Sequence, residues 1–152
     1  MTIQTKNPAT GKVVKLFEPH TDAYVEEAIS RAVQAQKVIA SWSFAKRKDH
    51  MEKVASILDA EAERLGAIIS LEMGKPITQA VREVQKCALV CRHYAENAEH
   101  YLEKDVVESH AKLSYRYYQP LGVIMAILPW NFPFWQVFRF AAPPLWLAIR
   151  AC

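Results

Sequence analysis

An asparagine between two prolines is the first feature of this sequence that could take part in chemistry. Asn131 lies in Pro-Trp-Asn-Phe-Pro (129–133), directly after the apolar run Leu-Gly-Val-Ile-Met-Ala-Ile-Leu (121–128). The prolines stiffen the backbone, so the side-chain NH₂ can act as a preorganised donor to an oxygen that gains negative charge. The simpler alternative is that Asn131 caps the following helix and satisfies the turn. The residues by themselves leave both alternatives open.

The cysteines and histidines are weaker candidates. Cys87 and Cys91 lie on one helical face with His93 nearby, but the sequence spaces no two further ligands to complete a metal site with them. We therefore predict that both cysteines pack in a helix core as small apolar side chains. Cys152, the last residue, has no helix or base beside it that would favour its thiolate, so it is not expected to be a nucleophile. Four further histidines are predicted to lie on the surface: His20, His50, His100 and His110.

Two short strands and three helices are predicted before residue 105. The strands surround Asn-Pro-Ala-Thr-Gly (7–11), where Gly11 can take a positive φ. One helix begins at Thr21 or Asp22 and runs to about residue 42, a second covers 45–74 with Gly74 as its C-cap, and Pro76 opens a third that reaches residue 102. Their predicted apolar faces are, in order, Val25, Ala28, Ile29, Ala32 and Val38 or Ile39; then Met51, Val54, Leu58, Ala62, Leu65 and Ile69; then Ile77, Ala80, Val84, Cys87, Cys91, Ala95, Ala98 and Leu102.

The periodicity changes in the last third of the sequence. Residues 112–119 alternate and are rich in tyrosine, which predicts a strand with one wetter face. The apolar run 121–128 predicts a strand covered on both faces, and Pro133 is placed to open a new helix. Helices followed by buried strands indicate an α/β fold, in which ligands gather beyond the carboxyl ends of strands. Asn131 is predicted to lie at such a place.

The segment Pro-Leu-Gly-Val-Ile-Met-Ala-Ile-Leu-Pro-Trp-Asn-Phe-Pro (120–133) closely resembles the aldehyde dehydrogenase superfamily. Asn-Pro-Ala-Thr-Gly (7–11) supports the resemblance, while 71–84 and 132–143 are most similar to its succinate-semialdehyde branch. The resemblance covers residues 7–143. It implies the N-terminal part of that fold, incomplete here: helices plus the start of a Rossmann-like cofactor domain over 1–152. It also implies that about 108–120 begin an oligomerisation arm, and that the catalytic domain is absent.

The resemblance also implies roles for particular residues. Asn131 would stabilise the oxyanion during oxidation of an aldehyde to an acid. Ile127, Trp130 and Asn131 would lie along the nicotinamide of NAD or NADP. Gln136 and Arg139 would line the substrate tunnel, with the Arg139 guanidinium holding the distal carboxylate of succinate semialdehyde through two parallel hydrogen bonds.

Other parts of the family mechanism are expected to be missing. The resemblance implies a cysteine nucleophile, a glutamate base and a cofactor-binding lysine, all downstream of Pro133. The sequence instead departs from the family after Pro143 and reads Pro-Leu-Trp-Leu-Ala-Ile-Arg-Ala-Cys (144–152). Codons for this stretch, read one base earlier, can spell Leu-Ala-Gly-Asn or Met-Ala-Gly-Asn, as the family would. We therefore expect a shifted reading frame and a chain inactive on its own.

Charge and composition exclude several other classes of function for this protein. The net charge is only +3 and basic residues alternate with acidic ones, so nucleic-acid binding is not expected. Residues 117–138 are uncharged, but their prolines argue against a membrane anchor. The absence of a signal peptide and of a disulfide pattern predicts a cytoplasmic protein. The parent enzyme is expected to be a homo-oligomer. A second hypothesis is a non-catalytic module that associates with full-length dehydrogenase subunits.

Overall fold

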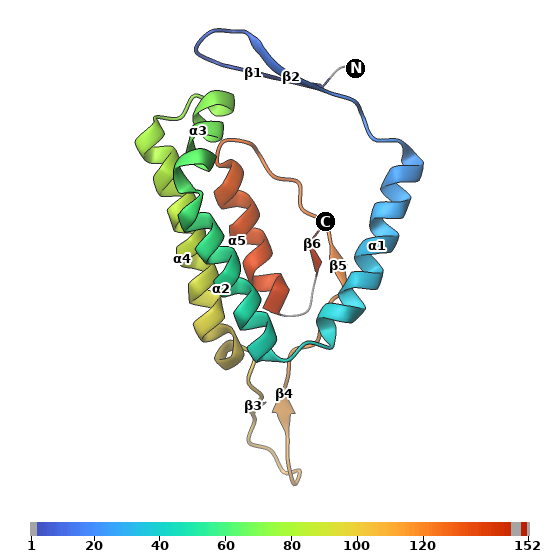
Figure 1. The fold of residues 1–152 in the computed structure, drawn as a ribbon. Helices are drawn as coiled ribbons and strands as arrows, with labels where there is room; N and C mark the ends of the chain where they lie inside the picture. Colours follow the sequence, from blue (N-terminus) through green and yellow to red (C-terminus); the bar gives the residue numbers. More distant parts are fainter. Residues whose placement is uncertain (1–2, 147–149, 152) are drawn as a thin grey trace.

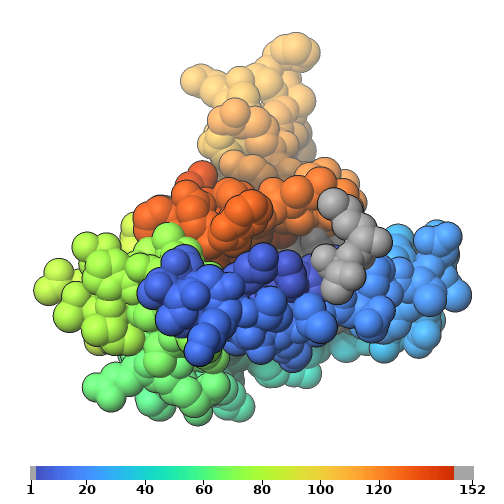
Figure 2. Space-filling model, turned by 90° about the horizontal axis from the view of Figure 1, so that it is seen from above, coloured from blue at the N-terminus to red at the C-terminus, as the bar shows by residue number. Residues whose placement is uncertain are grey.

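The N-terminus forms the predicted hairpin. The computed structural model describes residues 3–146, 150 and 151. Strand β1 (Ile3–Lys6) pairs antiparallel with β2 (Val13–Phe17). In the turn, the Asn7 side chain accepts a hydrogen bond from the Ala9 backbone N–H at 2.9 Å, and Gly11 has φ 68°. The hairpin lies at the top of the molecule in Figure 1 and across the face turned to the viewer in Figure 2.

Helix α1 (Asp22–Ala40) has its predicted start, but its apolar face is only partly used. Thr21 is the N-cap, and its hydroxyl accepts a hydrogen bond from the Tyr24 backbone N–H. Ala32 is buried, and Ala28 and Ile39 are half-buried, with Ile39 rather than Val38 on the inner side. Val25 and Ile29 are exposed, so the predicted face is wrong at these two. Figure 1 gives the reason: α1 lies apart from the other helices, which leaves its apolar face without a neighbouring helix.

The helix predicted over 45–74 is interrupted. The structure has α2 (Phe44–Ala60) and α3 (Ala62–Met73), separated at Glu61. Glu61 has φ −101° and ψ 6°, outside the helical region, so the chain changes direction there and α3 can pack against the next helix. The predicted apolar face is confirmed across the break. Its buried members are Met51, Leu58, Ala62 and Ile69, and Val54 and Leu65 pack against them.

Helix α4 (Ile77–Tyr101) is the centre of the helical layer. It packs against α2, α3 and α5, as Figure 1 shows. Gly74 ends α3 in the left-handed conformation, with φ 78°, so that the chain can reverse into α4. The predicted core face is confirmed except at Ile77, which is exposed. Its predicted members Ala80, Val84, Cys87, Cys91, Ala95 and Ala98 are buried, and Leu102 packs against them. Glu83 and Ala88, which were not predicted, are also buried on α4.

A short two-stranded arm follows. Strand β3 (Asp105–Val106) pairs antiparallel with β4 (Tyr115–Arg116), and the arm projects from the body of the molecule in Figures 1 and 2. The strand predicted over 112–119 is therefore present but shorter. Nearly all side chains of the arm are exposed, which leaves little packing to extend the strands.

The last elements form a β-α-β unit. Strand β5 (Val123–Ile124) leads through α5 (Pro133–Trp146) to β6 (Arg150–Ala151), which pairs parallel with β5. This unit confirms the α/β class and the helix start at Pro133. The prediction of a strand covered on both faces over 121–128 is wrong. Only two of those residues are in a strand, and Leu121 and Met125 are 82% and 74% exposed. The reason is that β5 pairs, within the described residues, with the two-residue strand β6 alone.

Candidate functional site

Asn131 lies in the loop between the end of β5 and the start of α5, as predicted. Its side chain is exposed and makes no hydrogen bond with any other described residue. The first free backbone N–H groups of α5, those of Phe134 and Trp135, donate instead to Glu83 on α4. The alternative in which Asn131 caps this helix is therefore not realised, and its NH₂ group can donate to a ligand.

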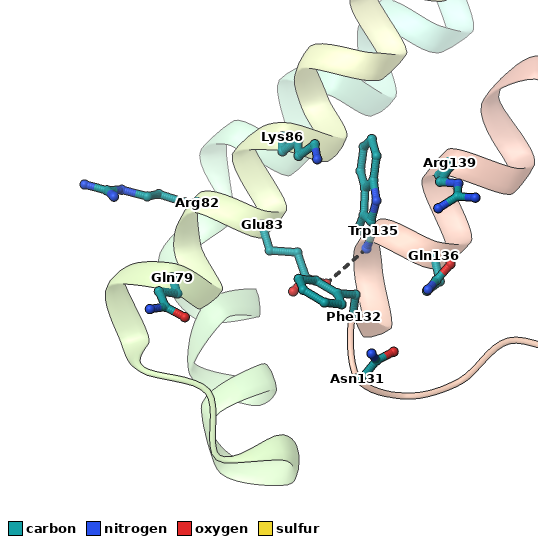
Figure 3. Close-up of a pocket in the computed structure, with 9 residues that line it drawn as sticks. All are labelled: Gln79, Arg82, Glu83, Lys86, Asn131, Phe132, Trp135, Gln136 and Arg139. Carbon is teal, nitrogen blue, oxygen red and sulfur yellow. Dashed lines mark hydrogen bonds between the residues drawn. The ribbon is translucent and has the colours of Figure 1, made fainter.

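A cavity of about 440 Å³ lies between α4 and α5, beside Asn131. Three of the predicted site residues, Asn131, Gln136 and Arg139, line it together, as Figure 3 shows. Helical spacing explains this convergence, because Gln136 and Arg139 are three residues apart and share one face of α5. The other lining residues are Gln79, Arg82, Glu83, Lys86, Phe132 and Trp135.

The other two predicted site residues are not part of this cavity. Trp130 is 82% exposed and lines a separate cavity of about 570 Å³ with β1, the end of α3 and Pro133. Ile127 is 87% exposed, beyond the end of β5. Both therefore present apolar surface beyond the carboxyl end of the strand.

Positive charge dominates the cavity lining. Arg82, Lys86 and Arg139 contribute cations, whereas the single carboxylate, that of Glu83, is already paired with Lys75. The Lys86 ammonium lies 3.8 Å from the centre of the Trp135 ring, a cation–π contact that fixes it over the indole. The cavity therefore suits an anionic ligand.

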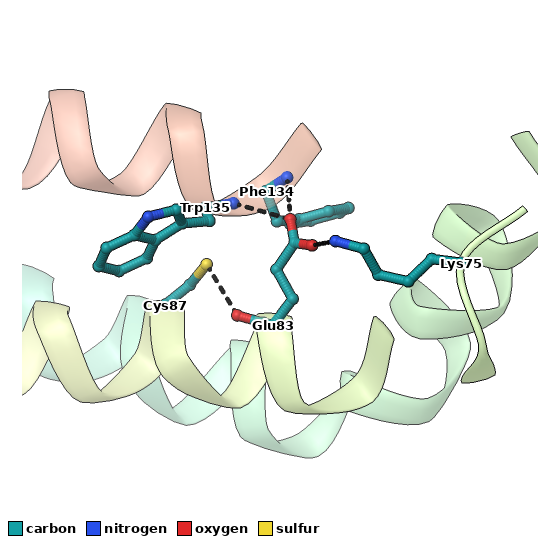
Figure 4. A network of polar contacts seen from close by, with 5 residues as sticks. All are labelled: Lys75, Glu83, Cys87, Phe134 and Trp135. Atoms are coloured by element: carbon teal, nitrogen blue, oxygen red, sulfur yellow. Dashed lines mark hydrogen bonds and ion pairs between the residues drawn. The ribbon is translucent and has the colours of Figure 1, made fainter. Parts of the chain in front are cut away.

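Glu83 and Lys75 are two further residues at the site that were not predicted from the sequence. Glu83 is 6% exposed and Lys75 is 8% exposed, which is rare for charged residues unless they are paired. Figure 4 shows the pair between α4 and the start of α5. One signal was available: Glu83 falls between Ala80, Val84 and Cys87 on the predicted apolar face of α4.

The cysteines behave as predicted. Cys87 and Cys91 are fully buried, and the Cys87 thiol donates to the Glu83 backbone carbonyl at 3.2 Å. Burial, reinforced by the negative charge of Glu83, raises the pKa of Cys87 to about 12, and burial raises the pKa of Cys91 to about 11. No cluster of metal-ligating side chains occurs among the residues that the structure describes. Cys152 lies outside the described residues, so its predicted lack of a catalytic role stays a prediction.

The surface predictions for the histidines are also confirmed. His20, His50, His100 and His110 are all exposed. His93 is exposed as well, on the opposite side of α4 from the cysteines, and its ring nitrogen lies 3.1 Å from the Tyr101 hydroxyl. Within the described part of the chain, no helix combines the length and the apolar composition needed to cross a bilayer.

The β-α-β unit, the amide at the strand end and the cationic cavity are features of an α/β enzyme site. The chain belongs to the aldehyde dehydrogenase family, whose model matches residues 1–148. It is 50% identical to the probable succinate-semialdehyde dehydrogenase (NADP(+)) of Synechocystis sp., over 95% of this chain and 32% of that relative. It is 47% identical to succinate-semialdehyde dehydrogenase (NADP(+)) 1 of Mycobacterium tuberculosis strain H37Rv, with the same coverage.

A solved structure matches over a similar share of this chain, at lower sequence identity. The crystal structure of succinic semialdehyde dehydrogenase from Streptococcus pyogenes, in complex with NADP⁺, has a TM-score of 0.93 and 32% identity, and the match covers 97% of this chain and 33% of that one. The chain therefore spans about a third of the length of the relatives that it matches.

Proposed function

We propose that this chain is the N-terminal, cofactor-binding part of an NAD(P)-dependent aldehyde dehydrogenase that oxidises succinate semialdehyde to its carboxylic acid. The single observation that supports this best is the cavity in which Asn131, Gln136 and Arg139 meet. An amide donor at one end and a guanidinium at the other suit an aldehyde with a distal carboxylate. The names of the relatives agree with this substrate.

Arg139 is proposed as the residue that holds the substrate carboxylate. It is exposed in the cavity lining and forms no salt bridge with another described residue, so its guanidinium can make two parallel hydrogen bonds to a ligand. Asn131 is proposed as the donor to the developing oxyanion. Gln136 lies between them on α5 and is proposed to line the path of the substrate.

The nicotinamide end of the cofactor is proposed to lie along Ile127, Trp130 and Asn131. The exposed apolar surface of Ile127 and Trp130, beyond the carboxyl end of β5, fits a flat aromatic ring. A nicotinamide bound there would supply the hydride acceptor for the oxidation. The relatives named above favour NADP⁺ over NAD⁺.

We further propose that these 152 residues are inactive by themselves. The reaction requires a cysteine thiolate, whereas burial favours the neutral thiol form of Cys87 and Cys91, and neither of them lines the cavity. The arm around β4 is proposed to be the start of an oligomerisation surface in the parent homo-oligomer, since its strands carry exposed edges.

The substrate assignment can be tested in a chimera that joins residues 1–143 to the following segment of the Synechocystis relative. Arg139→Leu should lower kcat/KM for succinate semialdehyde about ten- to hundredfold, because one charge-assisted carboxylate contact is lost. An uncharged aldehyde of similar length should be affected little. Lys86→Met is the matched control for removing a cation from the same cavity. An equal loss on both aldehydes in Arg139→Leu would overturn the substrate assignment and leave only the family.

A further inference from the structure

The first turn of α5 has no cap from its own neighbourhood. Backbone N–H groups at a helix start have no partner within the helix. Pro133 has none to satisfy, and Gln136 donates to the Phe132 carbonyl at 2.9 Å. The backbone N–H groups of Phe134 and Trp135 therefore still need an acceptor. Phe132, the residue before the helix, cannot provide one, because its side chain does not accept hydrogen bonds.

Glu83 supplies the missing acceptor from a distant helix. Its Oε1 accepts hydrogen bonds from the N–H groups of Phe134 and Trp135, each at 3.1 Å, across 51 and 52 residues of sequence. A carboxylate at this place is further stabilised by the dipole of α5. Its second oxygen accepts from the Lys75 ammonium, so both oxygens have partners (Figure 4).

Lys75 makes a second contact with the loop before α5, which contains Asn131 and Phe132. It follows Gly74, whose left-handed backbone turns the chain from α3 toward α4. Its ammonium pairs with Glu83 and lies 3.8 Å from the centre of the Phe132 ring. Phe132 directly follows Asn131, and the rigid ring of Pro133 joins it to the capped turn. The backbone on the helical side of Asn131 is thus held by two buried charges.

We propose that Glu83, with Lys75, is a positioning residue that sets the direction of the Asn131 amide toward the cavity. The pair acts on Asn131 through its contacts with Phe132, Phe134 and Trp135. The chemical role of Asn131 rests on the proposed function, whereas its positioning by Glu83 and Lys75 is independent of that function.

The test uses the 152-residue chain labelled with ¹⁵N at asparagine, phenylalanine and tryptophan. Amide hydrogen exchange is measured at Phe134 and Trp135, and backbone ¹⁵N relaxation is measured at Asn131. Glu83→Leu removes both acceptor oxygens, and Glu83→Gln keeps one. Val84→Ala is the control, because Val84 is the next residue of α4, is fully buried, and belongs to the hydrophobic core. Variants are compared at equal free energy of unfolding, adjusted with denaturant.

Glu83→Leu should speed exchange at Phe134 and Trp135 about tenfold or more relative to Val84→Ala, because hydrogen bonds to a charged acceptor are lost. It should also increase fast motion at Asn131, and Glu83→Gln should lie between it and the wild type. Exchange equal to that of Val84→Ala would overturn the proposal. Faster exchange without a change at Asn131 would overturn it too, because Glu83 would then be only a helix cap. If Glu83→Leu does not fold, Glu83→Gln decides by the same two readouts. None of these outcomes bears on the substrate test with Arg139→Leu.

Discussion

Asn131 and Arg139 line one cavity from a single continuous segment, the amide just before α5 begins and the guanidinium in its second turn (Figure 3). Their separation is therefore fixed by the geometry of one helix rather than by the docking of two domains. A ligand that contacts both residues must therefore have a length that matches their separation along α5. The two residues are expected to affect different properties of the reaction.

Asn131→Ala should slow the oxidation of every aldehyde alike. In the chimera with the Synechocystis relative, the loss in kcat should be about a hundredfold or more, as for removal of an oxyanion donor. KM should change little, since the proposed contact forms with charge that develops during the reaction. Steady-state kinetics with succinate semialdehyde and an uncharged aldehyde measure this. A selective loss on succinate semialdehyde would show that Asn131 recognises the substrate carboxylate instead.

Removing the Lys75 ammonium alone should destabilise the fold more than neutralising the pair. Lys75→Met leaves the Glu83 carboxylate buried without its counter-ion, which costs about 3–5 kcal/mol when both charges are buried. The double variant Lys75→Met, Glu83→Gln is expected to be more stable than Lys75→Met, because no unpaired charge remains and the glutamine oxygen can still accept from α5. Urea unfolding of the two single variants, the double variant and the wild type measures the coupling. Strict additivity would show that the two charges do not interact.

Features with local causes were predictable from sequence, and features that depend on distant partners were not. Thr21, Gly74 and Pro133 mark helix ends by their own backbone and side-chain chemistry, and all three were predicted at or next to their places. The break at Glu61 has no proline or glycine to signal it, because it serves the packing of α3 on α4.

At the site, too, local features were predictable from the sequence and long-range contacts were not. Asn131, Gln136 and Arg139 line one cavity because of their spacing on one segment, whereas their roles are implied by the family resemblance and stay predictions. The capping of α5 by Glu83 needs a contact across 51 residues, which no pattern of neighbours indicates. The short extent of β5 likewise depends on which strands pair with it.

The exposed apolar residues around β5 should bind hydrophobic dyes. Leu121, Met125, Ile127 and Trp130 are all more than 70% exposed within a short stretch of chain. The 152-residue chain should therefore enhance the fluorescence of a naphthalene sulfonate dye. Changing Leu121, Met125 and Ile127 to lysine should remove most of this signal without lowering the thermal midpoint, since these side chains lie outside the core cluster. Unchanged dye binding would place the apolar surface elsewhere, and a lower midpoint would show that these residues support the fold.

The buried thiols should make stability fall at high pH. Their folded pKa values, about 12 for Cys87 and about 11 for Cys91, exceed the ordinary value of 9.0. The stabilisation that comes from burying the neutral thiols is therefore complete below about pH 9. It is lost as the pH rises from there toward the folded pKa values, by up to about 1.4 kcal/mol per pH unit for each thiol. Denaturant unfolding across this range should show a steeper decline in the wild type than in Cys87→Ala, Cys91→Ala. Equal slopes would contradict the raised pKa values. A Cys152→Ser background keeps the third thiol out of the measurement.

The cap that Glu83 provides also implies that α4 forms before α5 during synthesis of the chain. A ribosome releases Lys75 and Glu83 well before Phe134 and Trp135, so α4 and its acceptor precede the helix that needs them. The loop between Glu83 and Phe134 is about fifty residues long. Closing it costs conformational entropy before the hydrogen bonds to Glu83 can stabilise α5. A peptide covering only α5 would begin with two unsatisfied N–H groups and should be poorly helical in water. The amide of Asn131 therefore takes its final place late, guided by a part of the chain made earlier.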